Sequence, residues 1–177
     1  TTPTDHVIND IKNFHKVIKT GLEEVKNGKI VTFGITPSYP ETGYGYIQLD
    51  KSSSQGPSKV LKFIEKPDEK LAKSMLDEDN FFWNSGIFMF RAKDMISAFE
   101  LYAKDIISKV VKSVDQSVED LSFTKLDKDY WSDLKEISID YAIMEKAKNL
   151  VAIAYSSGWS DLGNWDSVWR EAKQDQN

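Results

Sequence analysis

The chain has 177 residues, of which 40% are hydrophobic, 12% aromatic and 29% charged, and its formal net charge is -5 at pH 7. This length suits one domain over residues 1–177, and the composition argues against disorder. With no block of lysine or arginine, the chain lacks the basic face that nucleic-acid binding requires. It has no cysteine, which excludes disulfide and thiol chemistry and fits a cytoplasmic protein. No apolar run approaches the ~20 residues of a membrane span, so we expect no membrane partner.

The sequence predicts an alternation of helices and strands. Apolar residues at spacings of three and four predict a helix over residues 7–27, and a β-branched run predicts a buried strand over 30–35. A Ser/Gly/Pro loop at 51–58 is expected to be flexible, and residues 115–136 give no clear pattern. Further strands are expected at 44–49, 60–65, 82–90 and 151–155, and further helices at 69–77, 92–102, 105–114, 138–147 and from an N-cap at Asn164 to 172. This alternation predicts an α/β layer fold.

Four short motifs place polar residues beside aromatics or glycines at expected strand ends. They are PETGYGYIQL (40–49), FIEKP (63–67), FFWNSGIFMF (81–90) and GWSDLGNW (158–165). Small-molecule sites combine an apolar wall with a few convergent polar groups, and we interpret the four motifs as a sugar-phosphate site. A glycine-rich phosphate loop is absent from the sequence. Gly43-Tyr44-Gly45 opens like a dinucleotide fingerprint, but Gln48 stands where the third glycine is needed.

The FIEKP motif offers a carboxylate and an ammonium group at the end of a strand. Leu61, Phe63 and Glu65 alternate onto one face, with the first two expected in the core and Glu65 at its rim. Glu65 could accept sugar hydroxyls and Lys66 could bind a phosphate. The alternative is a surface Glu-Lys pair, which stabilises little.

Two further motifs each have a structural and a functional interpretation. Gly45 either forms a tight turn or lets the backbone approach a ligand closely. Asn84 lies inside an apolar strand, where an unpartnered amide costs ~1–3 kcal/mol. It either caps a bulge or points its amide at a sugar hydroxyl beside a wall formed by Trp83.

Two aspartates are candidate metal ligands. Asp161 lies between glycines after a strand, and Asp5 precedes the first predicted helix, where an ordinary N-cap is the alternative. Mg²⁺ takes one or two protein carboxylates, with phosphates and water completing its shell. Two histidines are too few for a zinc site.

Considered together, these motifs resemble the mannose-1-phosphate guanylyltransferase family, of the bacterial type often fused to a mannose-6-phosphate isomerase domain. The matching segments are PTDHVI (3–8), FGITPSYPETGYGYI (33–47), FIEKP, FFWNSGIFMFRA (81–92), SIDYAIMEKA (138–147) and GWSDLGNWDSVW (158–169), and they cover most of the chain.

The resemblance implies a Rossmann-like mixed sheet with helices on both faces, whose N-terminal part, including the triphosphate loop, is missing here. We therefore expect an open strand edge and no activity from this segment alone. The implied reaction is GTP plus mannose 1-phosphate giving GDP-mannose and pyrophosphate, with Mg²⁺ as cofactor. The implied substrate-binding residues are Thr42, Gly45, Glu65, Lys66, Asn84 and Ser85, the metal ligands are Asp5 and Asp161, and the catalytic groups are Lys66 and Asp161.

Three alternatives stay open on the sequence. The first is another sugar-1-phosphate nucleotidyltransferase, and the second is a non-catalytic sugar-nucleotide-binding module. The third is an isomerase activity of the parent protein, for which these residues offer no His/Glu metal cluster. A homo-oligomer is compatible with the sequence, which does not give the oligomeric state.

Overall fold

The computed structural model describes residues 1–50 and 56–172, so most of the predicted flexible loop, residues 51–55, lies outside the described residues. The chain forms two compact units, one from residues 1–91 together with 149–177 and the other from residues 92–148. All of the predicted site residues belong to the first unit, which therefore positions the candidate site.

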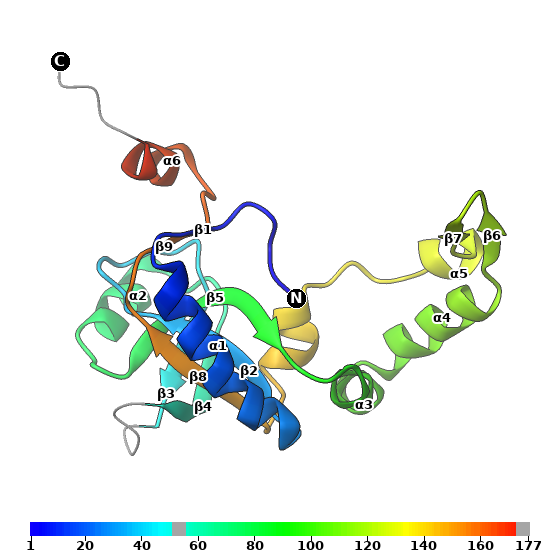
Figure 1. Cartoon of the computed structure of the whole chain (residues 1–177), viewed down its shortest axis with the longest axis horizontal. Coiled ribbons are helices and arrows are strands. Elements are labelled where there is room, and N and C mark those ends of the chain that lie inside the picture. Colours follow the sequence, from blue (N-terminus) through cyan, green and yellow to red (C-terminus); the bar gives the residue numbers. More distant parts are fainter. Residues whose placement is uncertain (51–55, 173–177) are drawn as a thin grey trace. The chain divides into compact units, whose positions relative to one another are not determined.

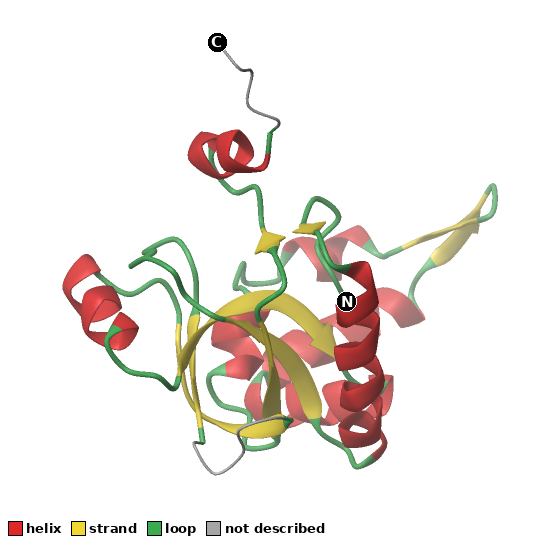
Figure 2. Cartoon of the chain, turned by 60° about the vertical axis from the view of Figure 1, so that its left-hand side comes forward, coloured by secondary structure: helices red, strands yellow, loops and turns green. Residues whose placement is uncertain are grey.

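Five strands of the first unit form one mixed sheet that closes on itself in the order β2-β5-β3-β4-β8 (Figure 2). β2 runs parallel to β8 and antiparallel to β5, while β3 pairs antiparallel with both β4 and β5. This architecture confirms the predicted α/β fold with a mixed sheet. The strands are β2 (Ile30–Ile35), β3 (Tyr46–Leu49), β4 (Pro57–Ile64), β5 (Phe81–Met89) and β8 (Leu150–Tyr155).

The closure of this sheet corrects our expectation of an open strand edge. β2 pairs with β8 along its whole length, from Ile30 opposite Leu150 to Ile35 opposite Tyr155, and the start of β4 pairs with the other side of β8. Every residue of β2 is buried, and buried backbone groups must find hydrogen-bond partners. β8 supplies these partners on one side of β2, and β5 supplies them on the other.

Helix α1 (Ile11–Lys26) lies beside β2 and β8 (Figure 1). Gly21 permits this close approach, since a Cβ there would lie 3.2 Å from Val31 Cγ1. The helix begins later than predicted because Asp10 caps it, accepting a hydrogen bond from the Asn13 amide at 2.9 Å. The residues before the cap instead form β1 (Val7–Ile8), which pairs with β9 (Trp159–Ser160).

Two shorter helices of this unit also begin at side-chain caps. Asp68 caps α2 (Glu69–Leu76) by accepting from the Leu71 amide. Asn164 caps α6 (Trp165–Glu171) as predicted, and Ser167 completes a reciprocal capping box. Among the described residues, no helix is long and apolar enough to cross a membrane.

An aromatic-rich core cluster lies below the predicted site. It contains Tyr44, Tyr46, Trp83 and Tyr155, with Tyr39 and Trp159 packed against it. Phe63 packs against a neighbouring cluster, as expected, although β4 ends at Ile64, one residue before Glu65. Leu61 was expected in the core as well, but it is 54% exposed. The pairing of β3 with β4 shifts register between Gln48 and Leu49, opposite this part of β4, which breaks the simple alternation.

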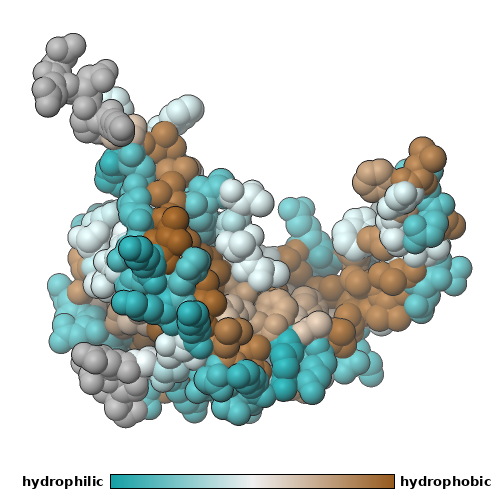
Figure 3. All heavy atoms as spheres, viewed as in Figure 1, coloured by the Kyte–Doolittle hydropathy of each residue, from teal (hydrophilic) through white to brown (hydrophobic). Residues whose placement is uncertain are grey.

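The second unit is mainly helical, and residues 118–132 of the stretch that gave no pattern form a hairpin and a short helix. Where an α-helix was predicted over 138–147, the structure has a π-helical turn, η1 (Asp140–Met144). Apolar side chains are exposed on this unit, including Leu121 and Phe123 of the hairpin, and Figure 3 shows apolar surface there. The other elements are α3 (Ala92–Tyr102), α4 (Lys104–Asp115), β6 (Val118–Asp120), β7 (Phe123–Lys125) and α5 (Lys128–Ser132).

Candidate functional site

Gly45, Glu65 and Asn84 come together from three separate motifs. The Asn84 backbone amide donates to the Gly45 carbonyl at 2.7 Å, just before β3 begins. A Cβ on Gly45 would lie 2.5 Å from Glu65 Oε2 and 3.5 Å from Asn84 Cβ. The absence of a side chain at Gly45 therefore makes room for the Glu65 carboxylate. This is the close approach that one interpretation of the glycine predicted, although here the neighbour is a carboxylate of the protein itself.

Asn84 is buried and has the polar partner that its position requires. The Thr32 hydroxyl lies 2.9 Å from Asn84 Oδ1 and 3.1 Å from the Ile87 carbonyl. This contact lies where the pairing of β2 with β5 is irregular, between Thr32 and Gly34. A bulge and an oriented amide therefore occur at the same residue, so the two interpretations of Asn84 are not exclusive.

Lys66 follows this group with an exposed side chain and a backbone in the left-handed region, at φ 47°. Its amide donates to the Tyr44 carbonyl at 3.2 Å, which joins the FIEKP motif to the PETGYGYIQL motif. A lysine with positive φ is uncommon, and such outliers concentrate at functional sites. Within residues 1–50 and 56–172, no carboxylate lies within ion-pair distance of the Lys66 ammonium group.

The two remaining predicted substrate residues differ in accessibility. Thr42 is exposed in a loop whose shape is fixed by Glu41, because the Glu41 side chain accepts from the Gly43 amide at 2.8 Å and its carbonyl accepts from the Tyr46 hydroxyl at 2.9 Å. Ser85 is 2% exposed, and its hydroxyl oxygen accepts from the Ile87 amide at 3.2 Å. The structure therefore gives Ser85 a role inside the irregular strand and does not present its hydroxyl to a ligand.

The two predicted metal ligands lie next to the short β1–β9 ladder, which pairs Val7 with Ser160. His6 lies beside both aspartates. Burial lowers the pKa of the His6 imidazole, and the nearby carboxylates of Asp161 and Asp5 oppose that shift. The neutral imidazole accepts a hydrogen bond at Nδ1 from Trp159 Nε1, at 3.2 Å.

Tyr44 connects the aspartate region with the sugar motifs. Its hydroxyl donates to Asp161 Oδ1 at 2.7 Å, and its carbonyl accepts from the Lys66 amide. Burial and the hydrogen bond to Asp161 raise the pKa of the Tyr44 phenol, so it stays a protonated donor. From the sequence, Tyr44 was expected only as part of a backbone turn and His6 was considered only as a zinc ligand, so neither of these contacts was predicted. The one sequence feature that could have indicated these contacts is the aromatic residue that each motif contains.

Aromatic rings surround the Tyr44 phenol. Its ring meets Trp83 and Trp159 edge to face, with ring centroids 5.3 Å and 5.4 Å away. Tyr39 packs in the same way on the other part of Trp83, at 4.9 Å, and Arg170 of α6 donates to the Tyr39 hydroxyl at 2.9 Å. These contacts hold the rings in place, and the role of Trp83 as a wall of the site stays a prediction.

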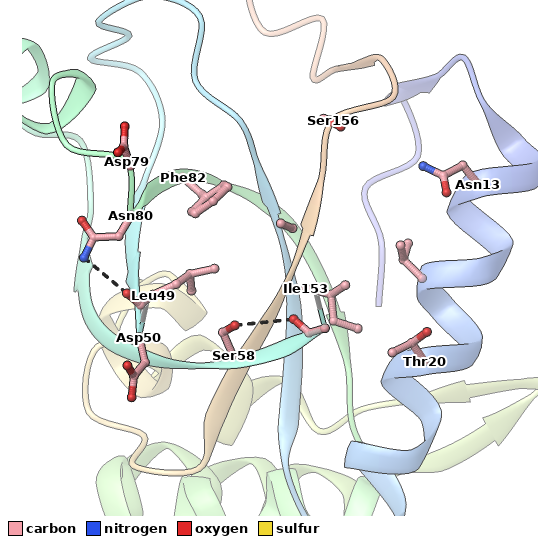
Figure 4. Close-up of a pocket in the computed structure, with 13 residues that line it drawn as sticks. Asn13, Thr20, Leu49, Asp50, Ser58, Asp79, Asn80, Phe82, Ile153 and Ser156 are labelled. Atoms are coloured by element: carbon pink, nitrogen blue, oxygen red, sulfur yellow. Dashed lines mark hydrogen bonds between the residues drawn. The ribbon is translucent and has the colours of Figure 1, made fainter. Parts of the chain in front are cut away.

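A separate cavity of about 840 Å³ lies between α1 and the closed sheet (Figure 4). Asn13 and Thr20 face it from the helix, and Asp79 and Asn80, from the segment before β5, also line it. None of the predicted site residues lines it, and among the described residues that line it there is no lysine or arginine.

Within the described ranges, no group of three or more His, Cys, Asp or Glu side chains could hold a metal ion. A site built on Asp5 and Asp161 would therefore offer two carboxylates. That number fits Mg²⁺, which usually keeps waters or substrate phosphates as its other ligands. It does not fit zinc, which takes at least three protein ligands.

Comparison with known proteins agrees with this reading of the motifs. A mannose-1-phosphate guanylyltransferase of Escherichia coli is 38% identical over 98% of this chain and 38% of its own length. One from Sinorhizobium fredii is 39% identical over 97% of this chain and 34% of its own length. The resemblance stated above is thereby confirmed, and the chain spans just over a third of the curated relatives that it matches.

Solved structures share the fold. A Thermus thermophilus protein described as mannose-1-phosphate geranyltransferase superposes with a TM-score of 0.82 and 29% identity, over 98% of this chain and 49% of that one. A mannose-6-phosphate isomerase of Helicobacter pylori gives a TM-score of 0.80 and 27% identity, over 90% of this chain and 62% of that one. The family model for nucleotidyl transferases matches residues 1–177, and hence includes both compact units. The chain belongs to the nucleotidyl transferase family.

Proposed function

We propose that the protein transfers GMP from GTP to mannose 1-phosphate, giving GDP-mannose and pyrophosphate, in the cytoplasm. The observation that supports this best is the position of Tyr44. Its hydroxyl contacts Asp161 and its carbonyl contacts the Lys66 amide, so a carboxylate suited to a metal and a cation suited to a phosphate belong to one connected site. The identity to relatives named mannose-1-phosphate guanylyltransferase supports the choice of sugar and nucleotide.

The sugar half of the proposed site consists of Thr42, Gly45, Glu65 and Asn84. The Glu65 carboxylate lies above the Gly45 α-carbon and would accept hydrogen bonds from mannose hydroxyls. The Asn84 side-chain amide would donate to another hydroxyl while Thr32 holds its oxygen. Trp83 would close the apolar side of the sugar pocket. Ser85 supports the strand and has no direct contact in this proposal.

The phosphate half consists of Lys66, Asp5 and Asp161. The Lys66 ammonium would bind the phosphate of mannose 1-phosphate as a point charge. Asp5 and Asp161 would hold Mg²⁺, which when bound neutralises phosphate charge. These positive charges matter because the chain carries a net charge of -5 and both substrates are anionic.

The reaction needs positioning more than proton transfer. An oxygen of the sugar phosphate attacks the α-phosphorus of GTP, a new P–O bond forms, and the bond to the β-phosphate breaks to release pyrophosphate. The attacking oxygen is already ionised, so no general base is required. Rate enhancement would come from alignment of the two phosphates and from charge stabilisation by fixed cationic groups.

A substitution of Lys66 tests this proposal in the full-length gene product that contains this sequence. Lys66→Ala removes a charge-assisted contact worth about 1.5–3 kcal/mol. We expect kcat/KM for mannose 1-phosphate to fall by about 10- to 100-fold, measured by pyrophosphate release. The fold should persist, because the side chain is exposed.

Lys62→Ala is the matched control, since Lys62 is an exposed lysine of β4, four positions before Lys66. We expect that variant to keep wild-type kinetics. Unchanged kcat and KM in Lys66→Ala would contradict the assigned role. A preference for another sugar 1-phosphate or another nucleoside triphosphate in the same assay would favour the first alternative, and no turnover with any of them would favour a non-catalytic module.

A further inference from the structure

The two oxygens of the Asp161 carboxylate have different surroundings. Oδ1 accepts two hydrogen bonds, from the Tyr44 hydroxyl at 2.7 Å and from the Gly163 amide at 3.0 Å. Oδ2 accepts no hydrogen bond from the described part of the chain. It lies over Gly163, where a Cβ would approach it to 2.5 Å. The protein therefore uses one oxygen to fix the carboxylate and leaves room around the other.

The donor on Tyr44 is itself held in place. The residue is 9% exposed, and its ring is packed against Trp83 on one side and Trp159 on another. Its carbonyl is fixed by the Lys66 amide. The phenol can therefore not follow Asp161 if the carboxylate turns, so the hydrogen bond defines one orientation of the carboxylate relative to the sugar motifs.

We infer that Tyr44 is a positioning residue, which holds the Asp161 carboxylate so that Oδ2 binds the divalent cation. This inference rests on the proposed function. The side chain of the Gly-Tyr-Gly segment then has a role as well as its backbone. Tyr44, which is next to Gly45 of the sugar site, sets the geometry of Asp161, a metal ligand 117 positions away.

Removal of the Tyr44 hydroxyl leaves Oδ1 with one donor, the Gly163 amide. The carboxylate can then rotate, and the cation site loses its fixed geometry. Partners that orient a metal ligand typically contribute 10- to 100-fold to metal affinity or activity. Tyr44→Phe keeps the ring and its packing against both tryptophans, and it removes the hydroxyl, which contacts Tyr39 as well as Asp161.

The experiment measures Mn²⁺ binding by the full-length gene product, using the electron paramagnetic resonance signal of free Mn²⁺ at saturating mannose 1-phosphate. We expect Tyr44→Phe to raise the Mn²⁺ dissociation constant about 10-fold. The concentration of Mg²⁺ that gives half-maximal turnover should rise in parallel, with the KM for mannose 1-phosphate within about twofold of wild type.

Tyr155→Phe is the matched control. Tyr155 is also a buried tyrosine of this core, and its hydroxyl lies 3.1 Å from the carbonyl oxygens of Asp10 and Ser157. That variant should bind Mn²⁺ as the wild type does. A lower melting temperature of Tyr44→Phe with unchanged Mn²⁺ affinity would show a merely structural role and would overturn the inference.

Gly163→Ala tests the same orientation from the other side without touching Tyr44. The backbone at residue 163 accepts an L-residue, but the new methyl group would displace Oδ2, so Mn²⁺ affinity should again fall about 10-fold. Wild-type affinity in this variant would also contradict the inference.

Asp161→Asn distinguishes a failure of the proposed metal site from a failure of the positioning role of Tyr44. If it leaves Mn²⁺ binding intact, the metal site of the proposed function is wrong, whereas if it abolishes binding while Tyr44→Phe does not, the positioning role alone fails.

Discussion

Two residues next to predicted carboxylate ligands have left-handed backbones. Lys66 follows Glu65 with φ 47°, and Leu162 follows Asp161 with φ 52°. This conformation costs an L-residue roughly 1–2 kcal/mol, so it persists only where surrounding contacts determine it. In both places the chain changes direction at the residue after the carboxylate, so Glu65 and Asp161 each lie at the end of an extended segment. Local strain at these positions is consistent with a site whose geometry matters more than its stability.

His6 gives a prediction for the effect of pH on stability. Burial lowers its pKa in the folded state, so between that value and 6.5 the unfolded chain binds more protons. The contribution of His6 to the free energy of unfolding is therefore fully present above pH 6.5 and is lost as the pH falls toward the pKa of the folded state. Protonation also places a hydrogen on Nδ1, which abolishes the acceptor for Trp159 Nε1. We expect the difference in free energy of unfolding between wild type and His6→Asn to shrink from about pH 7.5 to about pH 5.5.

Urea denaturation at the two pH values measures this difference, and carboxylate titrations common to both proteins cancel in it. The same substitution at His15, which is exposed on α1, is the control. A difference that stays constant or grows on acidification would show that the folded state accommodates the protonated His6.

At the scale of elements, the sheet depends on a glycine in β2. Gly34 lies against β5, and a Cβ there would meet Phe82 Cβ at 3.0 Å and Ile47 Cδ1 at 3.2 Å. The first neighbour is held by its own backbone and cannot turn away. Gly34→Ala should therefore overpack the sheet and lower the free energy of unfolding by about 1–3 kcal/mol, measured by chemical denaturation.

Gly43→Ala is the comparison for that variant. Its Cβ would meet the flexible end of the Glu41 side chain at 3.2 Å, in an exposed loop. A change within about 0.5 kcal/mol is expected there. Equal losses in the two variants would contradict crowding as the cause of the loss at Gly34.

Local patterns predicted most elements but not the contacts that assemble the site. The β-branched run gave the bounds of β2, and Asn164 was recognised as a cap because capping depends on residues three apart. The closure of the sheet depends on pairing between β2 and β8, which lie about 120 positions apart in the sequence and carry no local signal for register. The Tyr44–Asp161 hydrogen bond was missed for the same reason, whereas the distinctive motifs indicated that Gly45, Glu65 and Asn84 lie close together.

At the scale of the whole molecule, all of the predicted site residues lie within the first compact unit. The second unit contributes none of the predicted site residues, yet the family model includes it. It carries exposed apolar side chains such as Leu121 and Phe123. A homo-oligomer stays a prediction, and this unit offers apolar surface that such an assembly would bury.

The closed sheet makes a prediction about association. An open strand edge invites pairing with another chain, and closure removes that edge. We therefore expect the amides of β2 and β8 in the 177-residue chain to exchange with solvent deuterium slowly, at rates that do not change with protein concentration. Amides of the exposed β6–β7 hairpin should exchange fast and serve as an internal reference. Hydrogen exchange followed by mass spectrometry, over a tenfold range of concentration, measures both sets. Protection of β2 that appears only at high concentration would mean that another molecule, and not β8, pairs with this strand.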